Sequence, residues 1–260
     1  PLGRGRGVNG SCSIAAACVA LALRDVRLLV RKPSRVASTI LTPVLVWIFF
    51  AGGFAPALGG EESYTAALAS GVALLVVTFA AIFGAISMIR DRERGFLRAV
   101  LIGPTPRWAV IMSRVGVGAV LAWVQALPVL LAALAMGASP TAAGLAAGLA
   151  LLACGAIGLS ATCTALAWHF DSIEGFHGIM AAVLMPAWLL SGAVFPVEAR
   201  QGPLGIILEV NPLGYVHRAV TDALGIAETA GIAEPIVVLA FAALACIAAV
   251  AGARGDPIRA

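Results

Sequence analysis

Residues 115–167 read VGVGAVLAWVQALPVLLAALAMGASPTAAGLAAGLALLACGAIGLSATCTALA and contain no charged side chain over 53 positions. An α-helix needs about 20 consecutive apolar residues to cross the hydrocarbon core of a bilayer, so a run of this length holds two crossings. The sequence GASPT at residues 137–141 supplies the turn between them, because clustered Gly, Ser and Pro interrupt a helix. The stretch therefore predicts a pair of membrane-spanning helices.

The composition of the whole chain agrees with this interpretation. Hydrophobic residues make up 61% of the 260 positions and charged residues 12%, against about 25% charged residues in a soluble domain. The other charge-free runs are also long and unbroken, unlike the alternating strands of an outer-membrane barrel. We predict an all-α integral membrane protein with six transmembrane helices, at about 36–54, 65–89, 115–136, 142–167, 175–195 and 235–253.

Lys and Arg residues divide unequally between the two sides that six spans define. Fifteen of the seventeen lie in the tail before residue 36, the connection 90–114 and the C-terminal tail, whereas the other side holds only Arg200 and Arg218. Basic residues are retained on the cytoplasmic side of a membrane, so we expect both termini there. The net charge of +4 then reflects topology. A nucleic-acid partner is not expected, because the sequence has no basic stripe with interleaved aromatic residues.

The segment before the first predicted span has a pattern of its own. We predict that residues 1–35 form a cytoplasmic tail with an amphipathic helix and that residues 36–260 form the six-span domain. Its apolar stretch is too short to cross a bilayer, so the helix would lie at the membrane interface and end before Pro33. Cleavage as a signal peptide, over residues 4–22, is the alternative and would export the basic segment. Four arginines recur on one helical face, at i, i+3, i+7 and i+11: Arg24, Arg27, Arg31 and Arg35.

The predicted spans contain few residues that could bind an ion or catalyse a reaction. No Asp, Glu, Lys or Arg lies at mid-depth, which argues against a proton- or sodium-coupled carrier and against a channel with a charged filter. His169, His177 and His217 have no metal-ligand spacing, and Ser160 lies too far from His169 for a hydrolase site. The one lysine, Lys32, follows no glycine-rich loop and precedes proline, so no phosphate-binding loop is present. We expect no catalytic residue, metal or cofactor in this chain.

Charge concentrates instead at residues 90–107, RDRERGFLRAVLIGPTPR. Phe96, Leu97, Val100 and Leu101 fall on one face of a helix, and the sequence GPTP at 103–106 ends it. We therefore predict a short helix with an apolar face over residues 91–102. A solvated basic loop that only fixes topology is the alternative, and it would leave the ordered apolar face unexplained.

A second short helix is predicted on the opposite side of the membrane. Asn211 is a favoured N-cap residue and Pro212 suits the first helical position. Apolar residues then follow at helical spacing, and Pro203 begins a shorter apolar segment before them. Neither segment is long enough to span, so we predict a re-entrant helical hairpin between spans five and six, which must be buried against protein. A surface loop is the alternative.

Three motifs, in order, resemble the ABC-2 type permeases, the membrane subunits of a class of ABC exporters. The first is Asp91-Arg92-Glu93-Arg94-Gly95-Phe96-Leu97, followed by Gly103-Pro104-Thr105-Pro106. The second is Leu189-Leu190-Ser191-Gly192-Ala193-Val194-Phe195-Pro196 at the end of span five. The third is Asn211-Pro212-Leu213-Gly214-Tyr215, followed by Arg218. The chain departs from the family pattern at Arg98, where many relatives place an acidic residue.

This resemblance implies a permease subunit that exports a drug, glycolipid or polysaccharide-like substrate through the plasma (inner) membrane of a prokaryote. It implies a separate nucleotide-binding ATPase subunit, which would hold ATP and magnesium, and a homodimer or heterodimer of permease chains in membrane lipid. The ATPase-coupling residues carried over are Asp91, Arg92, Glu93, Arg94, Gly95, Phe96 and Leu97. The residues of the external re-entrant element are Asn211, Pro212, Tyr215 and Arg218.

The fifth span offers candidates for a substrate pathway. Pro186 lies midway in this span and can kink it, and Met180, Met185 and Trp188 nearby would form an adaptable apolar lining. Ordinary packing or lipid-facing positions are the alternative for these four residues. Two other functions stay open, a secondary carrier and a membrane protein with an assembly role. A secondary carrier built from inverted repeats would show similarity between its halves, and none is evident.

Overall fold

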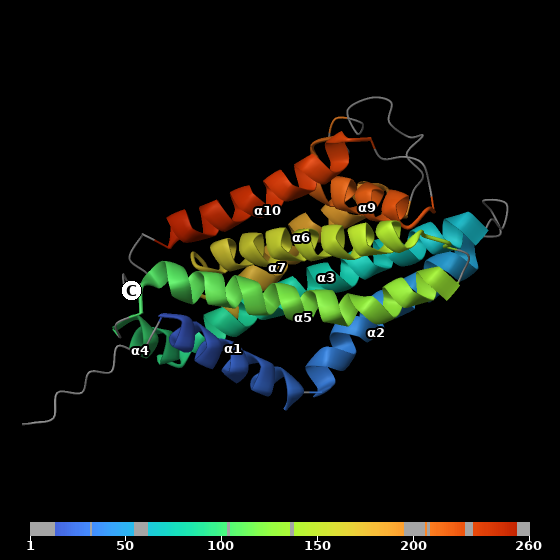
Figure 1. The fold of residues 1–260 in the computed structure, drawn as a ribbon. Helices are drawn as coiled ribbons and strands as arrows, with labels where there is room; N and C mark the ends of the chain where they lie inside the picture. The colour runs from blue at the N-terminus through green and yellow to red at the C-terminus, as the bar shows by residue number, and fades with distance from the viewer. Residues whose placement is uncertain are drawn as a thin grey trace, which may run out of the picture.

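The computed structural model describes residues 14–31, 33–54, 62–102, 105–135, 138–194, 206, 209–226 and 231–253, and the regular structure in these ranges is helical (Figure 1). The elements are α1 (Ile14–Val30), α2 (Pro33–Phe54), α3 (Glu62–Glu93), α4 (Phe96–Ile102), α5 (Arg107–Ala135), α6 (Ala142–Ala167), α7 (Ile173–Trp188), the π-helix η1 (Leu189–Ala193), α9 (Pro212–Ala223) and α10 (Ala233–Gly252).

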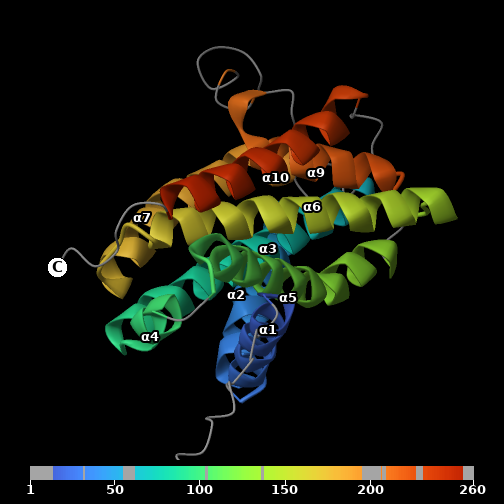
Figure 2. The same ribbon diagram turned by 60° about the vertical axis from the view of Figure 1, so that its left-hand side comes forward.

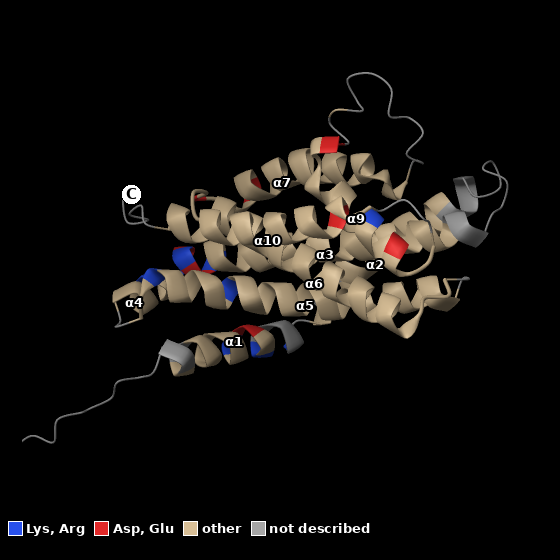
Figure 3. Cartoon of the chain, turned by 45° about the horizontal axis from the view of Figure 1, so that its top comes forward, with Lys and Arg blue, Asp and Glu red and all other residues tan. Residues whose placement is uncertain are grey.

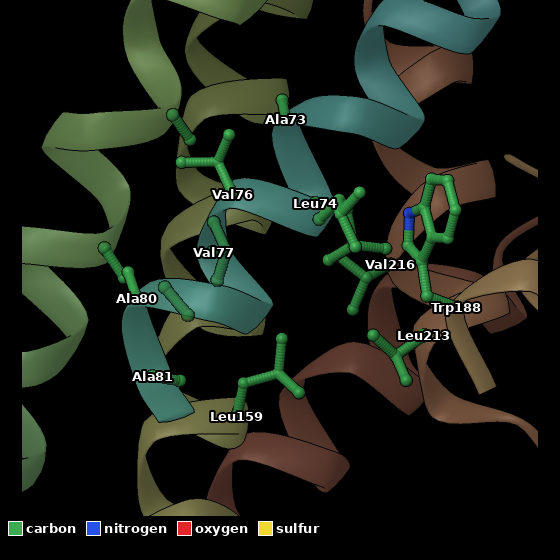
Figure 4. Packing of buried hydrophobic residues seen from close by; sticks show 14 of the residues in the cluster. Ala73, Leu74, Val76, Val77, Ala80, Ala81, Leu159, Trp188, Leu213 and Val216 are labelled. Carbon is green, nitrogen blue, oxygen red and sulfur yellow. The ribbon is translucent and has the colours of Figure 1, made fainter. Parts of the chain in front are cut away.

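The long helices run lengthwise beside one another, and α3 lies among them (Figures 1 and 2). Residues of α3 from Leu68 to Ile89 are buried in the main apolar core, because its neighbours cover it on several sides. Figure 4 shows part of this core, where Leu74 of α3 lies near Trp188 and near Val216 of α9. The helix α3 is thus shielded by protein, and its neighbours present their outer faces to the surroundings.

Five described helices are long and apolar enough to cross a membrane, which confirms a multi-pass integral membrane protein. They are Thr65–Glu93, Arg107–Ala135, Ala142–Ala167, Ile173–Ala193 and Ala233–Gly252. The first predicted span, 36–54, falls within α2, whose described apolar part is the shorter Thr39–Phe50. The sixth crossing therefore stays a prediction.

Two helices extend beyond the limits predicted from the charge-free runs. α3 continues to Glu93 instead of ending near residue 89, and α5 begins at Arg107 instead of 115. Charge marks where a helix leaves the hydrocarbon, but it does not end a helix, since Asp91 and Arg114 find ion-pair partners there. The predicted helix over 91–102 is corrected for the same reason: Asp91 is in the last turn of α3, and Arg94 and Gly95 form a turn before α4. Gly95 has φ 74°, a conformation that favours glycine.

The fifth span is broken near its end, where α7 passes into η1. Gly192 has φ 89° inside η1, and the indole Nε1 of Trp188 donates a hydrogen bond to the backbone oxygen of Gly71 at 2.8 Å. A Cβ at Gly71 would lie 3.0 Å from Cα of Ala193, so glycine allows α3 to approach this break closely. The predicted continuous helix to residue 195 is thus interrupted where η1 packs on α3.

The predicted second helix of the external element is present as α9. Asn211 caps it, since its side-chain oxygen accepts a hydrogen bond from the backbone N–H of Leu213 at 3.1 Å, and Pro212 occupies the first turn. Most of α9 is buried, which excludes a surface loop for residues 212–223. The segment that begins at Pro203 lies mostly outside the described residues, so the re-entrant hairpin stays a prediction.

Candidate coupling site at the charged ends of the helices

Four charged residues from three helices meet at the end of the bundle near α4, and we call them the ion cluster: Arg24, Asp25, Asp91 and Arg114. Nη1 of Arg24 donates to Oδ2 of Asp91 at 2.9 Å, and Nη2 of Arg24 donates to Oδ1 at 2.7 Å. Arg114 donates through Nη2 to the same carboxylate and through Nη1 to Oδ2 of Asp25 at 2.9 Å. The cluster joins α1, α3 and α5, and the contact between Arg24 and Asp91 is bidentate, the strongest form of arginine–carboxylate pairing.

In the ion cluster Asp91 and Arg114 are buried, Arg24 and Asp25 are half-buried, and the formal charges cancel. Asp91 is 4% exposed and Arg114 is 8% exposed, and two arginines face two aspartates. The hydrogen bond to Asp91 raises the pKa of Arg24, and burial opposes this effect. Removal of one member from a buried pair leaves an uncompensated charge and costs about 3–5 kcal/mol. The four residues therefore act as one unit that fixes α1 against the transmembrane helices.

The helix α4 is attached to this unit by an aromatic and an apolar contact. The guanidinium carbon of Arg24 lies 3.8 Å from the ring centroid of Phe96, within the range of a cation–π interaction. Leu97 is buried in a second apolar cluster together with Met88 of α3 and Val110 of α5. Through these contacts α4 is connected to α1, α3 and α5.

Arg92 makes a second connection, from α3 to the turn between α6 and α7. It donates to the backbone oxygen of Trp168 at 2.6 Å and to that of Phe170 at 3.0 Å. Its Nη1 also lies 3.5 Å from a carboxylate oxygen of exposed Asp171. This arginine satisfies the carbonyl group of the C-cap residue of α6, which a helix terminus leaves without an intrahelical partner, and one in the turn that follows.

The residues predicted to couple to a partner divide by orientation. Asp91, Arg92 and Leu97 point inward and hold the local structure, and Gly95 makes the turn. Glu93 and Arg94 are exposed. The surface available to a partner also includes positions that the sequence did not single out. We call it the coupling surface: Glu93, Arg94, Arg98, Ala99 and Ile102.

The substrate-pathway candidates lie on different faces of α7. Met180 and Trp188 are buried in the main core, Met185 is half-buried and Pro186 is exposed. Among the described residues these four side chains therefore do not share one lining, and their role in a pathway stays a prediction.

The candidates of the external element hold α9 to its neighbours. Asn211 donates through Nδ2 to the backbone oxygen of Ala187 at 2.5 Å, and the guanidinium of Arg218 lies 4.5 Å from the ring centroid of Tyr215. Nε of Arg218 is 3.6 Å from Oε1 of Glu234, at the start of α10. These contacts fasten the break after α7 and the start of α10 to one buried helix.

These elements fall within a known sequence family. The sequence profile of the ABC-2 type transporter family matches residues 16–224, from the first turn of α1 to the residue after α9. The chain belongs to the ABC-2 type transporter family. The resemblance inferred from the three motifs is therefore confirmed, and the family region contains the ion cluster, α4 and α9.

Two individual proteins are also similar to this ABC-2 type chain. Both carry the name "Putative transport permease ycf38", one from Porphyra purpurea at 28% identity over 193 residues and one from Pyropia yezoensis at 28% identity over 195 residues. Each alignment covers 71% of this chain and 66% of the relative. The matched part thus spans just under two thirds of these relatives' length.

Sequence reasoning missed the ion cluster of this ABC-2 type chain. The sequence pattern placed Arg24 on a basic face at the membrane interface. Its partner Asp91 is 67 positions away in the sequence, so the local pattern does not show the pair. Two signals were available: Asp25 is an acidic residue within a basic helix, and Asp91 and Arg114 are charges beside long apolar runs. Opposite charges at the ends of spans tend to pair.

The described residues contain no group of three His, Cys, Asp or Glu side chains that could hold a metal ion.

Proposed function

We propose that this chain is the membrane-spanning permease subunit of an ATP-driven exporter, powered by a separate nucleotide-binding ATPase subunit. The observation that carries the proposal is the attachment of α4 to the ion cluster, with the coupling surface left exposed. ATP and magnesium would be bound by the ATPase, because the 260 residues contain no phosphate-binding loop.

The arrangement suits the transmission of force from such a partner. The ATPase would bind the coupling surface through the aliphatic side chain of Ile102 and the charges of Glu93, Arg94 and Arg98. Movement of α4 would pass through Phe96 to Arg24, and through Leu97 to the core of α3 and α5. The ion cluster would keep the ends of α1, α3 and α5 together during this movement.

A six-span topology with both termini in the cytoplasm is part of the proposal. α1 is bound to Asp91 at the C-terminal end of α3, whereas α2 leads to the N-terminal end of α3, so α2 has to run back along the bundle. Lys and Arg residues gather near α1 and α4 at one end of the bundle (Figure 3), whereas Arg218 belongs to α9. Retention of basic residues in the cytoplasm would place α1 and α4 there.

The cargo would be an amphipathic or lipid-linked molecule, such as a drug, glycolipid or polysaccharide-like substrate. Outer faces of the spans carry exposed aliphatic side chains, among them Val120 and Leu131 of α5 and Leu239 of α10, and such faces suit lipid or a second permease chain. We propose a homodimer or heterodimer of permease chains in the plasma membrane of a prokaryote, with α9 as one arm of a re-entrant external hairpin.

The test uses two exposed isoleucines at opposite ends of the bundle. Ile102 on the coupling surface is 84% exposed and Ile232 before α10 is 87% exposed. We expect Ile102→Asp to weaken co-purification of a candidate ATPase about tenfold, the effect of losing roughly 1.4 kcal/mol of binding energy. Ile232→Asp should retain the ATPase and its substrate-stimulated hydrolysis. If both variants retained the ATPase equally, α4 would not be the docking element.

A further inference from the structure

A small cavity lies between α2, α3 and α5, away from the coupling surface and from α9. Its volume is about 30 Å³. Its walls combine apolar side chains, two glycines and two polar groups. They include Thr39, Ala80, Phe83, Gly84, Gly118 and Gln125.

Gln125 leaves a hydrogen-bond acceptor unused in this cavity. Its side chain is 9% exposed, and its amide Nε2 donates to the backbone oxygen of Leu121 at 2.9 Å. This bond fixes the amide orientation, so the remaining atom is the carbonyl oxygen Oε1, which has no partner among the described residues. A buried polar atom without a partner costs about 1–3 kcal/mol, which a bound donor group would recover.

The cavity has room only for a small terminal group of a ligand, such as the last carbon of an alkyl chain with its substituent. A Cβ at Gly84 would meet no atom of the described residues within 4 Å, and one at Gly118 would meet Oγ of Ser160 at 3.4 Å. Since one water molecule needs about 10–15 Å³ of such volume, the space suits a hydroxyl and the carbon that carries it. A folded ring or a sugar would not fit.

The depth of Gln125 indicates where the donor comes from. It lies eleven residues beyond Arg114 on α5, which is about 16 Å along a helix. Half the thickness of a hydrocarbon core is about 15 Å, so Gln125 lies near the membrane midplane if the ion cluster is at the interface. The donor group therefore reaches the cavity with a molecule dissolved in the membrane.

The chemistry of the walls selects the donor. Among the described residues no carboxylate lines the cavity, so an ammonium group would be buried without a counter-charge. A neutral hydroxyl donates one hydrogen bond to Oε1 and leaves its carbon against Phe83 and Ala80. We propose that this cavity binds the terminal hydroxyl of an uncharged amphiphilic alcohol, which donates to Oε1 of Gln125. The proposal does not depend on transport or on an ATPase partner.

The experiment uses the purified full chain in phosphatidylcholine nanodiscs and two photoreactive probes. One is an octanol with a diazirine partway along its chain, and the other is the isomeric heptyl methyl ether with the diazirine at the same place, which has the same length but no donor. After irradiation, mass spectrometry locates and quantifies the adducts. We expect octanol adducts on the peptides that contain Gly84 and Gln125, about fivefold above those of the ether, the ratio for one net hydrogen bond.

Three variants complete the design. Gln125→Met keeps the length of the side chain but removes the acceptor, and Gly84→Leu fills the cavity without changing Gln125; both should reduce octanol labelling there to the level of the ether. Val124→Leu, at an exposed neighbouring position on α5, is the control and should label as the native chain does. Equal labelling by octanol and ether, or octanol labelling unchanged in Gly84→Leu, would overturn the proposal. The Gly84→Leu result decides the matter if Gln125→Met does not fold.

Discussion

At the scale of single residues, Asp91 is the centre of the ion cluster. Its carboxylate accepts hydrogen bonds from both Arg24 and Arg114 while it is 4% exposed. Asp91→Asn leaves these two arginines facing only Asp25. Because loss of one partner from a buried pair costs about 3–5 kcal/mol, we expect the melting temperature in detergent to fall by roughly 10 °C. Circular dichroism at increasing temperature measures this change.

Asp171→Asn is the matched control for this prediction. Asp171 pairs with Arg92 at 3.5 Å, but its side chain is exposed, and exposed pairs contribute little to stability. We expect its melting temperature to stay within the error of the native value. If Asp91→Asn melted at the same temperature as Asp171→Asn, the ion cluster would have no role in holding α1 to the bundle.

At the scale of elements, Arg92 connects the end of α3 to the turn after α6. Arg92→Lys keeps the charge but replaces a planar fork, which reaches the carbonyls of Trp168 and Phe170, with a single ammonium group. Loss of one charge-assisted hydrogen bond is worth about 1.5 kcal/mol, so amide hydrogen exchange at residues 168–172 should accelerate about tenfold. Arg94→Lys, at an exposed position in the turn before α4, should leave this exchange unchanged. If the amides of residues 168–172 exchanged equally slowly in both variants, Arg92 would not stabilise this turn.

The limits of the elements could be predicted only in part. The predicted bounds 142–167 are confirmed by α6, because Thr141, at the end of the Ser-Pro-Thr sequence before it, caps the helix through Gly144. Asn211 was identified as the cap of α9 for the same local reason. The end of α3 was predicted too early and the start of α5 too late, because the charges there are satisfied by α1, which is far away in the sequence. Local patterns do not report such partners.

At the scale of the whole molecule, the charge asymmetry predicted which elements lie on the same side, but it did not predict the contacts between them. Counting basic residues placed α1 and α4 on one side, and the structure brings them into contact through Arg24 and Phe96. It could not predict that α3 is the most shielded helix, since its composition resembles that of the other spans. Nor could it reveal Gln125 as a buried acceptor, because its burial depends on packing against α2 and α3.

The proposed topology makes a prediction that uses exposed positions from three parts of the molecule: Ala16 on α1, Ile102 on α4 and Ile232 before α10. Each is changed to cysteine in a chain whose five native cysteines are replaced, and intact cells are treated with a membrane-impermeant maleimide. Ile232→Cys should react at once, because three spans separate it from Ile102. Ile102→Cys and Ala16→Cys should react only after permeabilisation. A reactive Ala16→Cys beside a protected Ile102→Cys would mean that α2 does not cross, since α3 alone would then separate the two positions.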